Sequence, residues 1–312
     1  MKIQRIVSFL PSATELIYEF GKEGLLFGVT HECKFPKEAQ EKLKIITSSI
    51  DSENLSSNEI NNKTNQLLNE GKEIFILNEK NLKLADPDLI ISQETCEVCA
   101  PHTNQVKKAI EILAKQPFVY SMNPHSIKEI LATVTELGKI FEERKKAEEI
   151  RINLEERIAN IKKIQHKIKP KVIALEWIDP FFTAGHWIPE MINFAGGRNM
   201  ISKKGERSKK ISLDDISKAD PDIILLMPCG FSAERTIEEY NNILRENPFW
   251  NELRAVKNKK LFALDADSFF SKPSIRTITG LDILIKIIEP ETSKNFKVPE
   301  NSYFNILEQI NT

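Results

Sequence analysis

The chain has 312 residues, and its 44 Lys plus Arg against 45 Asp plus Glu leave a formal charge of −1. This length accommodates two ordinary domains, and a charge so close to zero offers no positive field for a polyanion, which excludes nucleic acid as the expected partner. The 41% hydrophobic and 29% charged residues are typical of a folded globular protein, so disordered and collagen-like classes are excluded.

Short β-branched runs alternate with helical segments through the first half of the chain. Ser12 followed by Glu15 has the spacing of a capping box and predicts a helix that begins there. Residues 52–72, rich in Asn, Ser and Glu, predict a loop with a helix. We expect strands at residues 5–10, 25–29, 73–77, 88–92 and 118–121. This alternation predicts a largely parallel sheet.

Residues 126–168 contain almost no Gly or Pro and predict two helices, the second over 144–168. That helix is long enough to join two lobes, although a surface crossover helix within one sheet is an alternative. A second strand-helix series follows, with strands at residues 171–177, 222–227 and 261–264. The expected organisation is an N-terminal lobe at 1–143, a connecting helix at 144–168, a C-terminal lobe at 169–289 and a polar surface tail at 290–312.

The two predicted lobes share a local sequence pattern. ADPDLIIS at residues 85–92 and ADPDIILL at residues 219–226 each place Asp-Pro-Asp between a helix and a buried strand. The pattern hints at duplicated lobes, although it is also a common joint in α/β proteins.

All four cysteines fall just after predicted strands, where open parallel sheets bind their ligands. They are Cys33, Cys96, Cys99 and Cys229. We expect them to converge, with Cys33 within about 10 Å of the other first-lobe pair, a loose allowance for neighbouring loops. Three thiolates and an imidazole would suit zinc or an iron-sulfur cluster, a thiolate pair would suit redox chemistry, and buried inert thiols are the alternative.

Two histidines and a set of aromatic residues occupy equivalent positions. His31 and His186 follow strands, where each would contact a ligand or simply hydrogen-bond the backbone. The aromatic residues would line a large, flat, apolar ligand, or would pack in the core beneath the loops. They are Trp177, Phe181, Phe182, Trp187, Phe231, Phe269 and Phe270.

Recognisable catalytic, secretory and membrane-spanning signals are missing from the sequence. There is no phosphate-binding GxxxxGK[ST], GxSxG or HExxH motif, so we expect a protein without catalytic residues. No signal peptide is recognisable, and the longest apolar runs are far shorter than the roughly 20 residues of a membrane span. These features predict a cytoplasmic protein, or an extracytoplasmic one whose leader has been removed.

A family resemblance extends over most of the chain. It rests on RIVSFLPSATEL, GVTHEC, ISQETCEVCA, ALEWIDPFFTAGHWIPEMINFAGG, LMPCGF and DSFFSKPSIRTITGLDIL. These segments resemble the class III periplasmic-binding-protein superfamily, the substrate receptors of iron-siderophore and corrinoid ABC importers. HEC, CEVC, GHW and PCGF resemble its cobalamin-binding branch more narrowly. The resemblance implies two α/β lobes joined by one long helix, with the ligand in a cleft between them.

The resemblance also implies a binding site for cobalamin or a related corrinoid. Its ligand-contacting residues would be Ser12, Ala13, Gln93, Glu94, Cys96, Cys99, Phe182, Thr183, Gly185, His186, Trp187, Ser268, Phe269 and Phe270. The sequence therefore favours a non-enzymatic corrinoid-binding protein. A metal or redox protein that uses the four thiols is the alternative. A third hypothesis is an enzyme that acts on the corrinoid, but the sequence shows no recognisable acid-base pair, and only Glu176 and Asp179 lie on the expected ligand edge of the sheet.

Receptors of this superfamily are similar in presenting an acidic residue from each lobe to arginines of an ABC permease. Glu234 matches in the second lobe, whereas residues 101–106 of the first lobe contain no carboxylate. We therefore expect a cytoplasmic protein that does not serve an importer in the usual way, unless Glu97 or another nearby acid substitutes.

Overall fold

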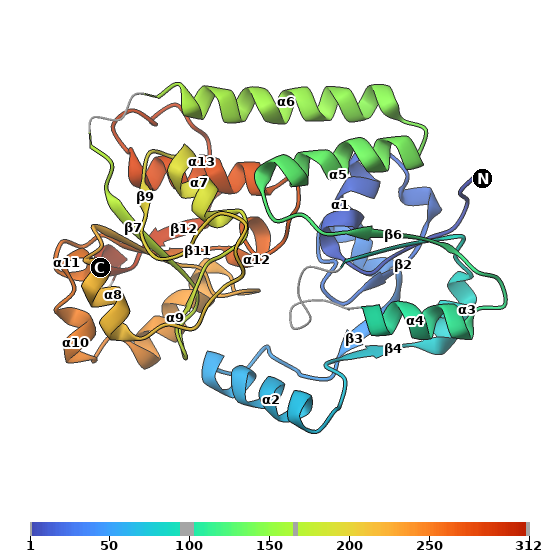
Figure 1. The fold of residues 1–312 in the computed structure, drawn as a ribbon, viewed down its shortest axis with the longest axis horizontal. Helices are drawn as coiled ribbons and strands as arrows, with labels where there is room; N and C mark the ends of the chain where they lie inside the picture. Colours follow the sequence, from blue (N-terminus) through green and yellow to red (C-terminus); the bar gives the residue numbers. More distant parts are fainter. Residues whose placement is uncertain (1, 94–102, 165–167, 310–312) are drawn as a thin grey trace. The chain divides into compact units, whose positions relative to one another are not determined.

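The chain folds into two compact α/β units in a computed structural model, which describes residues 2–93, 103–164 and 168–309 (Figure 1). The first unit comprises Met1–Leu55, Glu59–Pro124 and Lys128–Arg151. The second comprises Ser56–Asn58, His125–Ile127 and Ile152–Thr312. The predicted fold class, with a sheet and flanking helices in each of two lobes, is confirmed.

The first unit is built on a six-stranded sheet in the order β4-β3-β2-β1-β5-β6. All neighbouring strands are parallel except β3 and β4, which are antiparallel. The strands are β1 (Ile6–Ser8), β2 (Leu26–Thr30), β3 (Leu43–Ser48), β4 (Phe75–Leu77), β5 (Leu89–Gln93) and β6 (Phe118–Met122). Strand β3 was not among the strands expected from the sequence.

Helices cover both faces of this sheet because alternate strand residues point to opposite faces. Val7 and Ile90 pack in one core with Leu82 of α3 and Ala109 of α4. The described helices in this part of the chain are α1 (Pro11–Glu19), η1 (Glu23–Leu25), η2 (Lys37–Glu41), α2 (Ser57–Asn69), α3 (Glu79–Ala85), α4 (Thr103–Ile112) and α5 (Ile127–Ile140).

Helix α1 begins two residues earlier than the predicted capping box requires. Leu10 is its N-cap and makes no side-chain cap hydrogen bond, while Pro11 occupies the first helical position. Proline is favoured there because its φ is already helical and it has no N–H to satisfy. Ser12 therefore lies inside the first turn, and the predicted capping box at Ser12 and Glu15 is wrong.

Helix α6 (Arg144–Lys162) ends before residue 168, the end predicted from the sequence. The boundary between the two compact units falls inside this helix, after Arg151. Lys169 precedes Pro170, and a residue before proline disfavours helical backbone.

The second unit contains a sheet in the order β12-β11-β10-β7-β8, with β9 also paired to β7. Strands β7, β10 and β11 are parallel, and β8 and β12 are antiparallel to their neighbours. The strands are β7 (Lys171–Trp177), β8 (Phe182–Thr183), β9 (Arg198–Asn199), β10 (Ile223–Leu226), β11 (Leu261–Leu264) and β12 (Tyr303–Asn305).

Two groups of helices pack on this second sheet. Leu175 and Leu226 share a core with Ile216 of α8, Tyr240 of α9 and Trp250 of α10. Helix α13 is buried almost all round, as its apolar sequence requires. The described helices are α7 (Ile188–Phe194), α8 (Leu213–Ala219), α9 (Ala233–Ile243), α10 (Pro248–Asn251), α11 (Arg254–Lys257), α12 (Ala266–Phe269), α13 (Thr277–Ile288) and α14 (Ile306–Gln309).

The repeated Asp-Pro-Asp segment makes the same joint in each unit. Asp86 and Asp220 end α3 and α8 in the left-handed conformation, with φ of 39° and 47°. Two residues later, Asp88 accepts a hydrogen bond from the Arg5 N–H ahead of β1. Asp222 accepts one from the Lys171 N–H at the start of β7. Each second aspartate thus fixes the start of the neighbouring strand.

The C-terminal segment is part of the second sheet. Strand β12 pairs with β11, and Ile306 is fully buried in the core of this unit. The expectation of a surface tail is therefore wrong for residues 303–306. None of the helices in the described part of the chain is long and apolar enough to cross a membrane.

Candidate functional site

The loops that follow β7, β10 and β11 meet at the carboxyl edge of the second sheet. The Cys229 N–H, after β10, donates to the carbonyl of Glu176 near the end of β7 at 3.0 Å. The Asp267 N–H, after β11, donates to the carbonyl of Phe231 at 3.1 Å. Backbone hydrogen bonds therefore fix the three loops together at this edge.

Trp177, at the end of β7, contacts both the loop after β10 and the first residue of α2. Its ring meets Phe231 edge to face, with centroids 5.6 Å apart. Its indole N–H donates to the Ser57 carbonyl at 3.2 Å. The Arg235 guanidinium lies 3.7 Å from the Phe231 ring centroid, a cation–π contact. Trp177 is half-buried, so part of this aromatic surface is accessible.

The Gly185-His186-Trp187 loop follows β8 and has a tightly determined backbone. His186 adopts a left-handed conformation with φ of 52°. Its N–H donates to the Glu206 carbonyl, and its own carbonyl accepts from the Gly205 N–H. A Cβ at Gly185 would lie 2.6 Å from the Glu206 carbonyl oxygen, so only glycine fits.

His186 lies against His125, and both belong to the second unit. Their Nδ1 atoms are 3.0 Å apart and their ring centroids 5.1 Å apart. Burial, followed by His125 and Arg207, lowers the pKa of His186 from 6.5 to about 4. Its imidazole is therefore neutral at pH 7 and has a lone pair to offer.

The candidate residues of the second unit divide by exposure. Half-buried are Trp177, Phe182, His186, Cys229 and Ser268. Buried are Thr183, Gly185, Trp187, Phe231, Phe269 and Phe270. Phe181 is also half-buried, and its ring stacks on Trp250, against the core of this unit. Contact of these aromatic residues with a ligand stays a prediction, and the packing of Phe181 against Trp250 matches the core-packing alternative for that residue.

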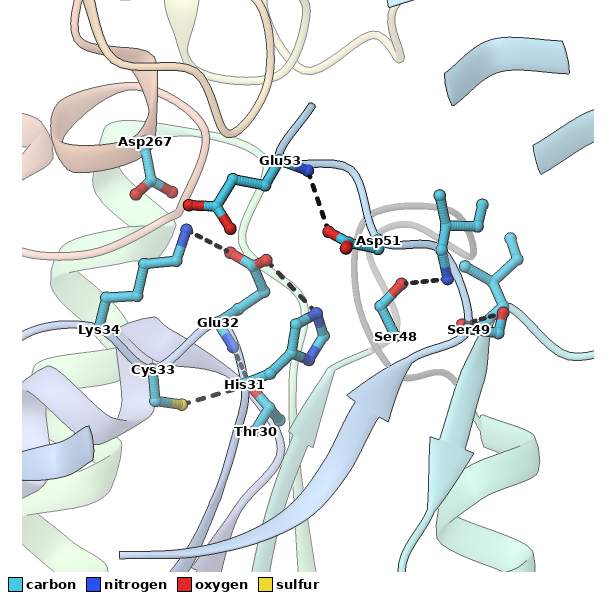
Figure 2. Close-up of polar contacts among 12 residues, drawn as sticks. Thr30, His31, Glu32, Cys33, Lys34, Ser48, Ser49, Asp51, Glu53 and Asp267 are labelled. Atoms are coloured by element: carbon cyan, nitrogen blue, oxygen red, sulfur yellow. Dashed lines mark hydrogen bonds and ion pairs between the residues drawn. The ribbon is translucent and has the colours of Figure 1, made fainter. Parts of the chain in front are cut away.

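In the first unit, the strand ends also carry buried candidates. Ser12, Ala13, Cys33 and Gln93 are buried, and the Ser12 hydroxyl has no hydrogen-bond partner among the described residues. The Thr14 hydroxyl donates to the Cys33 Sγ at 3.1 Å. The Thr30 hydroxyl oxygen lies 3.4 Å from the same sulfur (Figure 2). This environment is that of a packed thiol.

His31 is the half-buried candidate of the first unit. Its Nε2 lies 3.4 Å from a Glu32 carboxylate oxygen, and the other Glu32 oxygen lies 3.8 Å from Lys34 (Figure 2). The His31 N–H donates to the Ile46 carbonyl of β3. The imidazole is thus held by a local network at the end of β2.

Among the described residues, no three His, Cys, Asp or Glu side chains are grouped so that they could hold a metal ion. The predicted metal site at Cys33, Cys96, Cys99 and Cys229 includes residues outside that part of the chain and stays a prediction. Cys33 is fully buried and Cys229 half-buried. Glu94, Cys96 and Cys99 lie outside the described residues, so the predicted distance from Cys33 to the pair stays a prediction.

His125 was not among the site residues expected from the sequence. It follows β6 directly after Met122, Asn123 and Pro124, so the strand-end rule that selected His31 applied to it equally. The signal that would have selected it is its pairing with His186, which depends on tertiary structure.

Comparison with known proteins gives a family and a fold. Residues 6–268 match the sequence profile of the periplasmic binding protein family. The high-affinity heme uptake system protein IsdE of Staphylococcus aureus is 27% identical over 167 residues, which are 49% of this chain and 56% of that protein. The match thus spans little more than half the length of this curated relative.

Two solved structures share the fold across nearly the whole chain. A possible iron-binding, periplasmic solute-binding protein from Staphylococcus epidermidis has a TM-score of 0.67 at 24% identity, covering 93% of this chain and 100% of that one. The periplasmic vitamin B12 binding protein BtuF of Vibrio cholerae has a TM-score of 0.66 at 19% identity, covering 94% and 98%.

These comparisons overturn the expected cytoplasmic location. The matching family is one of periplasmic binding proteins, and the similar proteins are periplasmic receptors or part of an uptake system. The prediction rested on the unrecognised signal peptide and on the missing first-lobe carboxylate. Neither observation outweighs a family match over residues 6–268.

Proposed function

The chain belongs to the periplasmic binding protein family, and from this premise we propose that it is a non-enzymatic receptor that delivers a metal tetrapyrrole to an ABC importer. A corrinoid is the first candidate, because the HEC, GHW and PCGF segments resemble the cobalamin-binding branch. Heme is the second, because the matched relative from Staphylococcus aureus is a heme uptake protein. A large flat ring and a central metal are common to both.

The observation that carries this proposal is a set of half-buried groups in the second unit, two of them at the carboxyl edge of its sheet and one in the loop after the antiparallel strand β8. Trp177 and Phe182 supply aromatic surface, and His186 supplies a neutral imidazole. Aromatic surface suits a flat apolar macrocycle, and imidazole nitrogen is a good ligand for iron or cobalt. The hydrogen bonds between the loops hold these groups in place without the ligand.

Contact with a permease would use the exposed carboxylate of Glu234. It lies in the first turn of α9, two residues after the N-cap Ser232, and is exposed. A carboxylate there is accessible to an arginine of a membrane partner. The first-unit counterpart is not assigned.

The test is a titration of the purified protein with cobinamide, cyanocobalamin, heme, metal-free protoporphyrin and a ferric siderophore, followed by absorbance and calorimetry. We expect micromolar or tighter binding of a metal tetrapyrrole. Trp177→Leu should weaken it at least about tenfold, since buried aromatic contacts of this kind dominate binding energy. Phe249→Leu is the control, because that ring is 74% exposed on α10. Failure of every metal tetrapyrrole to bind at micromolar concentration would remove the proposal.

A further inference from the structure

The contact between His125 and His186 is a head-on pair of ring nitrogens. The two Nδ1 atoms are 3.0 Å apart, whereas the two ring centroids are 5.1 Å apart. The difference is close to the sum of the two distances from a ring centroid to its own nitrogen. Both Nδ1 atoms therefore lie close to the line that joins the ring centres. Two lone pairs cannot face each other at this distance, so one Nδ1 carries a proton and donates it to the other.

This hydrogen bond couples the tautomers of the two rings. In a neutral pair, the donor ring has its proton on Nδ1 and a free lone pair on Nε2. The acceptor ring has its proton on Nε2 and no lone pair free for a metal. The donor is therefore the ring whose Nε2 can coordinate iron or cobalt.

Both rings are held by their backbones. The Ile127 N–H, two residues after His125, donates to Oε2 of the buried Glu190 at 3.1 Å. Glu190 lies in α7, which begins directly after Trp187, and its other carboxylate oxygen pairs with Lys204 at 2.5 Å. The same helix thus anchors the segment with His125 and follows the loop with His186.

We propose that His125 is a positioning residue that accepts the Nδ1–H of His186 and so keeps the His186 Nε2 lone pair free for the metal of a tetrapyrrole ligand. This inference rests on the proposed function and adds a role for a residue that the sequence did not select. A ligating histidine commonly donates its second ring N–H to a fixed acceptor, which sets its tautomer and orientation. Here that acceptor is another imidazole.

The first experiment needs no ligand. Nitrogen-15 NMR of the histidine rings in the ligand-free protein at pH 7.5 should show His186 protonated on Nδ1 and unprotonated on Nε2, with the opposite pattern in His125. His186→Gln and His125→Asn spectra assign the signals. The reverse pattern, or no change in the His186 tautomer when His125 is replaced by Phe, would overturn the proposal.

The second experiment measures ligand binding. His125→Phe should weaken heme or cobinamide binding about 10- to 100-fold, the usual cost of losing the partner of a ligating histidine, and should shift the absorption bands of the bound metal. His125→Asn restores an acceptor and should recover most of the affinity. Metal-free protoporphyrin should bind equally to all three proteins.

Equal loss with metal-free protoporphyrin would show that His125 is only structural, and wild-type affinity in His125→Phe would overturn its role. If the wild-type protein binds metal tetrapyrrole and His186→Gln leaves the absorption bands unchanged, the ligation role of His186 fails while the proposed function survives. If the wild type binds no metal tetrapyrrole, the proposed function fails, and the ligand part of this inference with it.

Discussion

The Glu239 carboxylate accepts a hydrogen bond from the backbone N–H of Ser57 at 2.6 Å, and both residues are buried. Ser57 is the first residue of α2, where backbone N–H groups have no partner within the helix. The Ser57 carbonyl also accepts the indole N–H of Trp177. A carboxylate on α9 thus fixes the start of α2 and, through it, the orientation of an aromatic candidate residue.

Glu239→Ala should therefore lower the free energy of unfolding by about 1–3 kcal/mol, because a buried N–H loses its acceptor. Urea unfolding and the amide exchange rate of Ser57 measure the effect. Glu239→Gln keeps an acceptor oxygen and should be milder. Glu238→Ala, an exposed neighbour on the same helix, is the control. Equal stability of the Glu239→Ala and Glu238→Ala variants would contradict this assignment.

The pKa of His186 gives the stability of the protein a pH dependence. Because that pKa is about 4 in the fold and 6.5 without it, the unfolded chain takes up a proton at higher pH. The contribution of the neutral His186 ring to the free energy of unfolding is therefore fully present above pH 6.5. It falls as the pH drops from 6.5 towards 4 and is lost below pH 4. When the Tm is plotted against pH from 4 to 7.5, the His186→Gln variant should show a shallower slope than the wild type. His31→Gln is the control, and a slope unchanged by His186→Gln would rule out this titration.

Gly185 is required by the backbone that passes beside it. Gly185→Ala would place a methyl group 2.6 Å from the Glu206 carbonyl oxygen and 2.7 Å from the Ser208 nitrogen. Because neither backbone atom can rotate away, we expect a loss of about 1–3 kcal/mol in urea unfolding. Gly24→Ala, where no atom lies within 4 Å of the new Cβ, should be near neutral. Wild-type stability of Gly185→Ala would show that this loop shifts freely.

Periodicity and strand spacing predicted most of the fold, and the errors have local physical causes. The sequence contains two signals for the start of α1, the Ser12 and Glu15 spacing and Pro11. The helix begins at Pro11. Strand β3 lies in a lysine-containing stretch with only Ile45 and Ile46 fully buried, which gives a weak alternating pattern. Strand β12 has three residues, too few for any periodicity.

Those features of the candidate site that follow from the order of strands and loops could be predicted from the sequence. The strand-end rule placed Cys229, Phe231 and Ser268 on one edge, because parallel strands end together. The same rule cannot tell a half-buried Trp177 from a buried Trp187, since exposure depends on how each loop folds back. Nor can it show that His125 faces His186, because the two residues are 61 positions apart.

The pairing of β12 with β11 also bears on self-association. Without residues 303–305, the backbone N–H and carbonyl groups along one side of β11 would be unpaired and would offer a template for a strand from another molecule. The antiparallel addition of a three-residue strand leaves an outer edge too short to extend the sheet further. A segment that supplies no candidate ligand contact thus protects the protein against aggregation through its second sheet.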